Sequence, residues 1–411
     1  MVMGLVAVVA GACAPALELV GDPTTHSAAG EHAELDSPPP NTPARVASRA
    51  TAAGAALRHD PIDPHEIDET PAVLDARVAR ARHCADGRSS LRLQDDLRDL
   101  SDMQAWRERA RAFVRCALGV DQREGAPLDL QVHQETRIDG GVTRLRISYA
   151  LGDTYRGQAL RVPAFLFVPA TDHPVPAVIV YHGHGEGKIA VAERENTPEG
   201  ALGREIARRL GYVVLAPDSR TFGDFGFAEH GAYYRSLTSQ NPTDAYIARL
   251  AGDGERDMRV LRSLPGVDAT RIGVAGVSMG SWRAMLHAVI QPSVQAVVIS
   301  ALYLPFSELF SPIHDPCQHA PTLAAMLGMQ DLALSLSDRA LMIQWGGHDG
   351  AFSARARTLL DATRVAFDAI GASDHLHVDV DPDRGHEFGR SAAPSFLSNQ
   401  LGPGASEVHD P

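Results

Sequence analysis

The sequence lacks the clustered positive charge that binding to nucleic acid requires. Its 38 basic residues are outnumbered by 51 acidic ones, which gives a net charge of -13, and no run is rich in Lys and Arg. Nucleic acids and anionic membrane surfaces both select for basic patches, so neither is an expected partner. A small-molecule substrate is therefore the expected partner.

Cysteine is scarce, with four in 411 residues. Cys13, Cys84, Cys116 and Cys317 form no C-x-x-C pair, so a structural zinc site is not expected. If the protein is exported, Cys84 and Cys116 are the pair expected to form a disulfide, because both lie at the ends of predicted helices. Two buried free thiols are the open alternative, since connectivity cannot be read from a sequence.

Long apolar runs are also missing, because no segment after the N-terminus reaches the roughly 18 residues of a membrane span. Residues 1–20 place a short apolar stretch before Cys13, the order of a secretory signal followed by a lipid-modified cysteine. The alternative is a frayed apolar terminus or a misplaced start codon. We expect a secreted or cell-envelope lipoprotein, and otherwise a cytoplasmic protein.

Two segments precede the expected catalytic region. Residues 21–69 are rich in Pro, Ala, Ser, Thr and acidic residues, a composition typical of a flexible linker. Residues 70–129 predict a helical extension, with Thr70 as an N-cap and a capping box from Ser101 to Gln104. Its two helices are expected over 70–82 and 101–119.

Alternating strands and helices predict the fold of residues 130–400, which are followed by a tail over 401–411. Two antiparallel strands joined at Gly140-Gly141 are followed by a third, and apolar strands then alternate with helices. This order indicates an α/β fold with a mostly parallel, doubly wound sheet. The expected strands are 130–138, 143–150, 161–168, 177–181, 212–216, 272–275, 295–300, 341–345 and 376–380, and the expected helices are 199–210, 253–264, 279–290, 353–370 and 393–399.

The pentapeptide Gly276-Val277-Ser278-Met279-Gly280 is typical of a nucleophile elbow. It follows a short apolar strand and leads into a helix, the order that lifts a serine hydroxyl above the end of a sheet. Glycines are needed on both sides because the turn strains the serine backbone and leaves no room for a Cβ nearby. Ser278 is therefore the candidate nucleophile.

A base and an acid follow Ser278 in the order that this architecture requires. Asp349 lies in a glycine-rich loop directly after the strand 341–345, and His386 lies in the loop after the strand 376–380. Ligand sites in open α/β sheets gather at the carboxyl ends of strands, so both are well placed. The predicted catalytic triad is Ser278, His386 and Asp349, while Asp338 or Asp361 and His375 or His377 are the alternatives.

The oxyanion hole is expected to combine two backbone N–H groups. Met279 supplies the one after the nucleophile, and His184 supplies the other from the loop after the strand 177–181. A second interpretation is a metal site, because His182 and His184 at i and i+2 can both ligate zinc. No carboxylate or third histidine joins them in the local pattern, so no metal is expected.

Four further residues are candidates to line the pocket: His182, Trp282, His314 and Cys317. The last two belong to a cluster in the long connection between residues 300 and 341. Cys317 is not expected to be catalytic because Ser278 already has its base and acid. Packing beneath a lid is the alternative for this cluster.

The sequence resembles the α/β-hydrolase superfamily, in its dienelactone hydrolase-like and acetyl xylan esterase-like branch. The residues that carry the resemblance lie between about 130 and 400. They are His182-Gly183-His184-Gly185, the turn Asp218 to Gly223, Val267-Asp268 with Arg271-Ile272-Gly273, the elbow, Gly347 with Asp349, and Gly385-His386-Glu387-Phe388.

This resemblance implies a serine hydrolase of carboxylic esters with the α/β-hydrolase fold, acting without a cofactor. Acetyl esters of carbohydrates are a candidate substrate, and the N-terminus is a candidate lipid anchor. Dienelactone hydrolases proper carry a cysteine nucleophile, so Ser278 favours an esterase. Ser281-Trp282 after the elbow also departs from the family pattern and puts the inherited pocket shape in doubt. The alternatives are a serine peptidase of the same fold and a non-catalytic binding protein.

Overall fold

Strands from all parts of the catalytic region join in a single sheet. The computed structural model describes residues 71–93, 102–120, 126–240, 246–311 and 314–405. The expectations for Cys13, the linker 21–69, Thr70 and Ser101 lie outside these residues. Within them, a nine-stranded sheet has the order β1-β2-β3-β5-β4-β6-β7-β8-β9. The strands are β1 Gln131–Ile138, β2 Val142–Tyr155, β3 Gln158–Pro169, β4 Val175–Tyr181, β5 Val213–Pro217, β6 Val267–Val277, β7 Val294–Ser300, β8 Ala340–Gly346 and β9 Leu376–Asp381.

The sheet is antiparallel at one edge and parallel through its centre. β1, β2, β3 and β5 pair antiparallel, whereas β5, β4, β6, β7, β8 and β9 pair parallel. The central strands β4, β5 and β8 are buried along their whole length, which is why they read as continuous apolar runs. The carboxyl ends of β4, β6, β8 and β9 therefore meet at one edge, as expected for the site.

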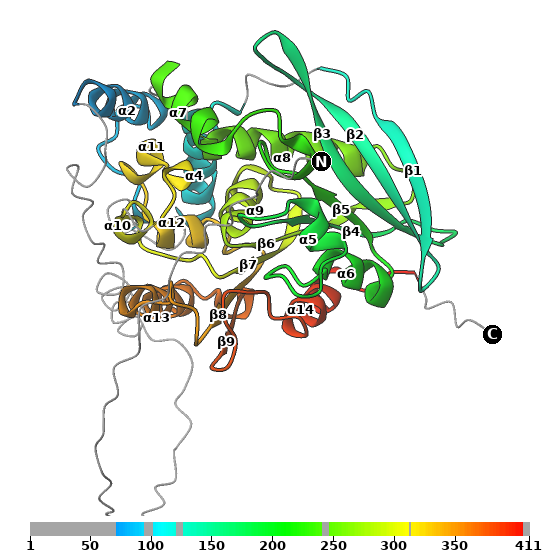
Figure 1. The fold of residues 1–411 in the computed structure, drawn as a ribbon. Coiled ribbons are helices and arrows are strands. Elements are labelled where there is room, and N and C mark those ends of the chain that lie inside the picture. Colours follow the sequence, from blue (N-terminus) through cyan, green and yellow to red (C-terminus); the bar gives the residue numbers. More distant parts are fainter. Residues whose placement is uncertain (1–70, 94–101, 121–125, 241–245, 312–313, 406–411) are drawn as a thin grey trace, which may run out of the picture. The chain divides into compact units, whose positions relative to one another are not determined.

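Helices cover both faces of this sheet (Figure 1). On one face α5, α6 and α14 pack against the apolar side chains of the central strands. On the other face α8, α9 and α13 form the larger core. The helices are α2 Pro71–Cys84, α4 Met103–Ala117, α5 Lys188–Ala192, α6 Leu202–Leu210, α7 His230–Gln240, α8 Tyr246–Arg262, α9 Met279–Ile290, α10 Phe306–Leu309, α11 Pro321–Ala324, α12 Met329–Leu334, α13 Ala354–Ala369 and α14 Ala392–Leu401, with 3-10 turns η4 Gly223–Phe225, η5 Pro316–Gln318 and η6 Ser373–His375.

The N-terminal helices pack on the larger core. α4 buries one face, including Trp106 and Phe113, and Trp106 donates its indole N–H to the carbonyl of Leu91 at 3.0 Å. Arg111 and Arg115 of α4 donate to carbonyls in the last turn of α9, Val289 and Ile290. Cationic side chains at a helix C-terminus satisfy carbonyls that have no partner within the helix.

A disulfide joins the two N-terminal helices, between Cys84 at the end of α2 and Cys116 near the end of α4. Among the described residues the remaining cysteine, Cys317, is free and buried. No helix in the described ranges is both long enough and apolar enough to span a bilayer.

The sequence-based boundaries differ from the structure at several places. α8 begins at Tyr246, seven residues before the expected start at residue 253, and α6 begins at Leu202 rather than residue 199. Residues beyond α14 belong to the packed unit, because Ala405 donates its N–H to the carbonyl of Gly211 at 3.0 Å. The helix α7 and the short helices α5, α10, α11 and α12 were not predicted.

Candidate active site

Ser278 lies at a strained turn between β6 and α9. Its backbone has φ 55° and ψ -126°, a conformation that non-glycine residues rarely adopt. A Cβ on Gly276 would lie 2.0 Å from the carbonyl oxygen of Gly280, and one on Gly280 would lie 2.4 Å from that of Tyr181. The turn therefore needs both glycines, for the reason that the elbow pattern predicts.

Neighbouring strands hold this turn through hydrogen bonds. Ser278 donates its N–H to the carbonyl of Ser300 at the end of β7, at 2.9 Å. The buried hydroxyl of Ser281 contacts the carbonyls of both Gly276 and Ser300. Ser281, whose presence departs from the family pattern, therefore ties the first turn of α9 to two strands.

Asp349 and His386 form a hydrogen-bonded pair. Nδ1 of His386 lies 2.8 Å from Oδ2 of Asp349, whose side chain is 3% exposed while that of His386 is 41% exposed. Because a carboxylate only accepts, Nδ1 carries the proton, and Nε2 is left free to accept one. Among the alternatives, His375 instead contacts the carbonyl of Ser337, and His377 packs on Phe396.

Direct contacts between loops bring this pair to the elbow. The N–H of His348, next to Asp349, donates to the carbonyl of Arg384 at 3.0 Å. The hydroxyl of Ser300 donates to the carbonyl of Glu387 at 2.9 Å, and Ser300 also accepts from Ser278. Ser300 thus links the loop of the candidate nucleophile to the loop of the candidate base.

The loop after β4 lies directly against Ser278. A Cβ on Gly183 would be 3.1 Å from Cβ of Ser278, so a larger residue would crowd the nucleophile. The N–H of Gly183 donates to Oε1 of the buried Glu199 at 3.0 Å. Glu199 was not singled out in the sequence, yet it fixes the loop that carries His184. Met279, the other residue expected in the oxyanion hole, is the first residue of α9, where backbone N–H groups have no partner within the helix.

His182 is buried and uses both ring nitrogens within the protein. Nδ1 lies 2.6 Å from the carbonyl of Gly183, and Nε2 accepts from the N–H of Ser219 at 2.8 Å. Burial lowers the pKa of His182 to about 4. The ring is therefore neutral at neutral pH, and it joins the loop after β4 to the loop after β5.

A buried ion pair shapes the turn after β5. Nζ of Lys188 lies 2.6 Å from Asp218 and 2.7 Å from Asp224, and the side chains of Lys188 and Asp218 are both fully buried. Asp218 also accepts from the N–H groups of Lys188 and Asp224. Glycine is required beside this carboxylate, since a Cβ on Gly223 would lie 2.3 Å from its Oδ1.

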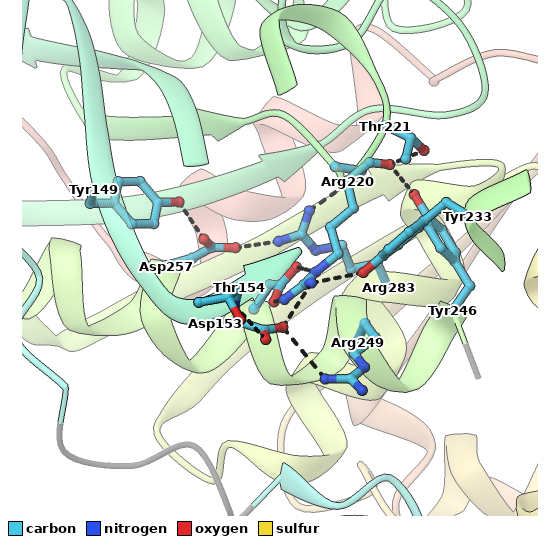
Figure 2. Close-up of polar contacts among 12 residues, drawn as sticks. Tyr149, Asp153, Thr154, Arg220, Thr221, Tyr233, Tyr246, Arg249, Asp257 and Arg283 are labelled. Atoms are coloured by element: carbon cyan, nitrogen blue, oxygen red, sulfur yellow. Dashed lines mark hydrogen bonds and ion pairs between the residues drawn. The ribbon is translucent and has the colours of Figure 1, made fainter. Parts of the chain in front are cut away.

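Arg220 anchors the same turn in the core (Figure 2). Its guanidinium binds Asp253 through two hydrogen bonds of 2.7 and 2.8 Å and also contacts Asp153 and Tyr233. Two hydroxyl groups, those of Tyr246 and Thr221, donate to the carbonyl of Arg220. Hydrogen bonds to both the side chain and the backbone carbonyl of Arg220 therefore fix the turn that follows β5.

The other pocket candidates have different environments. Trp282 is 1% exposed and donates its indole N–H to the carbonyl of Gln318 at 3.0 Å, so it packs beneath the connection from β7 to β8. Cys317 is also buried, and burial raises the pKa of its thiol. His314 is partly buried and near enough to His386 and Asp349 to interact electrostatically with both.

Comparisons with known proteins agree with this architecture. The model of the dienelactone hydrolase family matches residues 162–346. No curated protein matches the chain. Similar solved structures include a protein of Bacteroides fragilis NCTC 9343 assigned as an acetyl xylan esterase (16% identity, TM-score 0.57, 69% of this chain and 76% of that one). A second is the methylesterase BT1017 (16% identity, TM-score 0.56, 82% of this chain and 69% of that one). A third is a glucuronoyl esterase from Teredinibacter turnerae T7901 (14% identity, TM-score 0.55, 86% of this chain and 99% of that one).

At these identities the structural likeness establishes the α/β-hydrolase fold alone. The match to the family model bears out the expected resemblance to dienelactone hydrolases.

Proposed function

We propose that this protein of the α/β-hydrolase fold, whose residues 162–346 match the model of the dienelactone hydrolase family, hydrolyses carboxylic esters with Ser278 as its nucleophile. The observation that carries the proposal is the strained Ser278 turn, which Ser300 links to the loop of the hydrogen-bonded pair His386 and Asp349. The family model and the esterases of the same fold support the reaction class.

The geometry supports a two-step acyl transfer. Oγ of Ser278 attacks the acyl carbonyl while Nε2 of His386 takes the hydroxyl proton, and the same proton then passes to the departing alkoxide. Asp349 holds Nδ1–H of His386 and stabilises the imidazolium that forms. The N–H groups of Met279 and His184 stabilise the oxyanion. Water hydrolyses the acyl-enzyme by the reverse proton movement, and no step calls for a cofactor.

Esters of carbohydrates are the proposed substrates. Acetyl xylan, glucuronoyl and methyl ester hydrolases are among the proteins of similar structure, so both acetylated sugars and sugar acid esters are candidates. The net charge of -13 agrees with a neutral substrate better than with a polyanion. Acetylated xylan is therefore the first substrate to test.

The protein is proposed to be exported from the cytoplasm. The disulfide between Cys84 and Cys116 supports an oxidising compartment, since such bonds are rare in reducing ones. A lipid anchor at Cys13 would then hold the protein at the envelope. Fractionation of cells that produce the full chain or its Cys13→Ser variant tests this, and an unchanged distribution would exclude the anchor.

Turnover of p-nitrophenyl acetate, acetylated xylan and a methyl glucuronate ester tests the reaction class. The wild-type protein is expected to hydrolyse at least one of them, and Ser278→Ala is expected to lower kcat by about 10³-fold or more. A variant that keeps full turnover would exclude Ser278 as nucleophile. Hydrolysis of peptide substrates with no ester turnover would favour a peptidase, and no turnover of either kind would favour a binding protein.

A further inference from the structure

Three side chains from distant segments converge beside the loop after β4. His184 follows β4, His230 opens α7, and Cys317 lies in η5. Each offers one ligand atom, and these atoms all lie within 4.8 Å of one another. Nε2 of His184 lies 3.2 Å from Sγ of Cys317. Two imidazoles and one thiol form a donor set that suits Zn²⁺.

The hydrogen bonds around His230 fit one tautomer. The hydroxyl of Thr221 contacts the carbonyl of Arg220, which can only accept, and lies 2.8 Å from Nδ1 of His230. With its one hydrogen on that carbonyl, the hydroxyl accepts from Nδ1–H, which leaves the lone pair of the ring on Nε2. Among the described residues this Nε2 atom is buried and has no hydrogen-bond partner. A buried nitrogen lone pair is costly when nothing uses it. His319 shares this feature, but of these two histidines only His230 has two further donor atoms within 4.8 Å in the part of the chain that the structure describes.

The backbone that holds Thr221 is itself strained. Thr221 has φ 71°, a left-handed conformation that β-branched residues almost never adopt. The Arg220 carbonyl next to it accepts from Tyr246 at 2.5 Å, and the Arg220 side chain is bound in the core (Figure 2). This arrangement is the kind of outer contact that fixes the tautomer of a metal-binding histidine.

The carboxylate of Asp315 lies beside the three donor side chains. Oδ2 of Asp315 lies 3.5 Å from Nε2 of His184, and its side chain is 59% exposed. The rings of His184, His230 and Phe222 pack on one another. Three donors are thus enclosed, while Asp315 or water can supply a fourth from the solvent side.

We propose that His184, His230 and Cys317 bind a Zn²⁺ ion that fastens the segments around α7 and η5 to the loop after β4. Bonds of about 2.0–2.1 Å to nitrogen and about 2.3 Å to sulfur place tetrahedral ligand atoms about 3.3–3.6 Å apart. The separation of 3.2 Å between His184 and Cys317 is already close to this range, and the others, none above 4.8 Å, reach it by side-chain movement. Binding replaces the Cys317 S–H bond with a bond from zinc to the thiolate, and the proton is released to solvent. The proposal does not rest on the ester-hydrolase reaction, although the loop that zinc would fasten also carries the His184 N–H assigned to the oxyanion hole.

Metal titration of the purified full chain tests the site. After treatment with a chelator, the protein is expected to bind one Zn²⁺ by calorimetry, and Co²⁺ in its place should give a thiolate-to-metal charge-transfer band. Cys317→Ser should abolish the band, and His230→Gln should weaken binding at least about 100-fold. Thr221→Val, which removes the acceptor for Nδ1–H of His230, should weaken binding about 10–100-fold.

His319→Gln is the matched control, because this histidine neighbours Cys317 in the chain but is outside the cluster. It is expected to bind Zn²⁺ as the wild type does. Far-ultraviolet circular dichroism shows whether each variant is folded, and Thr221→Val provides a second route if Cys317→Ser is not. Absence of stoichiometric binding, or a charge-transfer band that persists in folded Cys317→Ser, would overturn the proposal. In that event the contact between His184 and Cys317 is a hydrogen bond of imidazole and thiol.

Discussion

At the scale of single residues, the pair of Asp349 and His386 carries the clearest chemical information. The carboxylate is almost fully buried and lies 2.8 Å from Nδ1, so its charge acts on the imidazole with little competition from water. A buried carboxylate at this position selects one tautomer of the base. The neighbouring contacts between Gly347 and Asp381 and between His348 and Arg384 keep both loops in register.

Asp349→Asn is expected to lower kcat for ester hydrolysis by about 10³–10⁴-fold, because an amide that donates toward Nδ1 favours the wrong tautomer of His386. Steady-state kinetics with p-nitrophenyl acetate measures the change. Asp361→Asn is the control, since the side chain of Asp361 is 72% exposed and pairs with Arg364 on the same helix, α13. Equal activity of the two variants would show that Asp349 is not the triad acid.

Glu199→Ala is expected to lower kcat by up to about 10²-fold with little change in KM, because the loop that presents the His184 N–H loses its support at Gly183. Glu199→Gln keeps an oxygen that accepts from Gly183 and should recover most of the rate. Kinetics of the three proteins on one acetyl ester tests this. Equal losses in both variants would instead assign the effect to the carboxylate charge.

At the scale of elements, the turn after β5 depends on a charge pair that has no access to water. Lys188 opens α5 and lies between Asp218 and Asp224. Burial is the largest influence on Asp218 and raises the pKa of its carboxyl despite the nearby ammonium group. For Asp224 the hydrogen bond from Lys188 is the largest influence, and it lowers the pKa.

Lys188→Met is expected to reduce the free energy of unfolding by about 3–5 kcal/mol, because it leaves Asp218 buried without a counter-charge. Arg146→Met is the matched control: Arg146 pairs with the same Asp224, but its side chain is 47% exposed. That change should cost less than about 1 kcal/mol. Urea denaturation measures both, and similar losses would contradict a special role for the buried pair.

Element positions in the parallel sheet could be predicted because these strands are apolar on both faces. β4, β8 and α9 all lie within two residues of their expected bounds. The short helices α10, α11 and α12 could not be predicted, because segments of four to six residues are set by packing rather than by their own periodicity. The start of α8 was missed for a related reason, since nearly all of its residues are buried and its apolar stripe is broad.

The candidate site also contains residues that could be predicted from the sequence and residues that could not. Ser278, Asp349 and His386 could be predicted because each lies in a loop next to a recognisable strand. Glu199 and the cluster of His184, His230 and Cys317 could not, because their partners are far away in the chain and only the folded sheet brings them together. Local spacing in the sequence points to His182 with His184 alone, because it carries no sign that His230 and Cys317 lie beside His184 in the fold.

At the scale of the whole molecule, buried neutral histidines couple stability to pH. Burial lowers the pKa of His287 to about 3, whereas an exposed histidine titrates near 6.5. As the pH falls below 6.5, the unfolded chain gains a proton on His287 that the folded chain does not accept until about pH 3. The contribution of this residue to stability is therefore fully present above pH 6.5 and is lost as the pH falls toward 3.

His287→Gln removes that proton linkage. The stability of the wild type relative to this variant is expected to decrease steadily from pH 7 to pH 4, because only the unfolded wild-type chain is protonated at residue 287 in that range. Urea denaturation of both proteins at a series of pH values measures the difference. A difference that stays constant over this range would contradict a neutral, buried His287.

Labelling with a fluorophosphonate tests the central claim most directly, because this reagent reacts with a serine only when a base and an oxyanion hole activate it. The intact wild-type chain is expected to gain the mass of one adduct, which peptide mapping places on Ser278. His386→Ala should label at least about 10²-fold more slowly. No adduct on the folded wild type, an adduct on another serine, or equal labelling of His386→Ala would contradict Ser278 as the activated nucleophile.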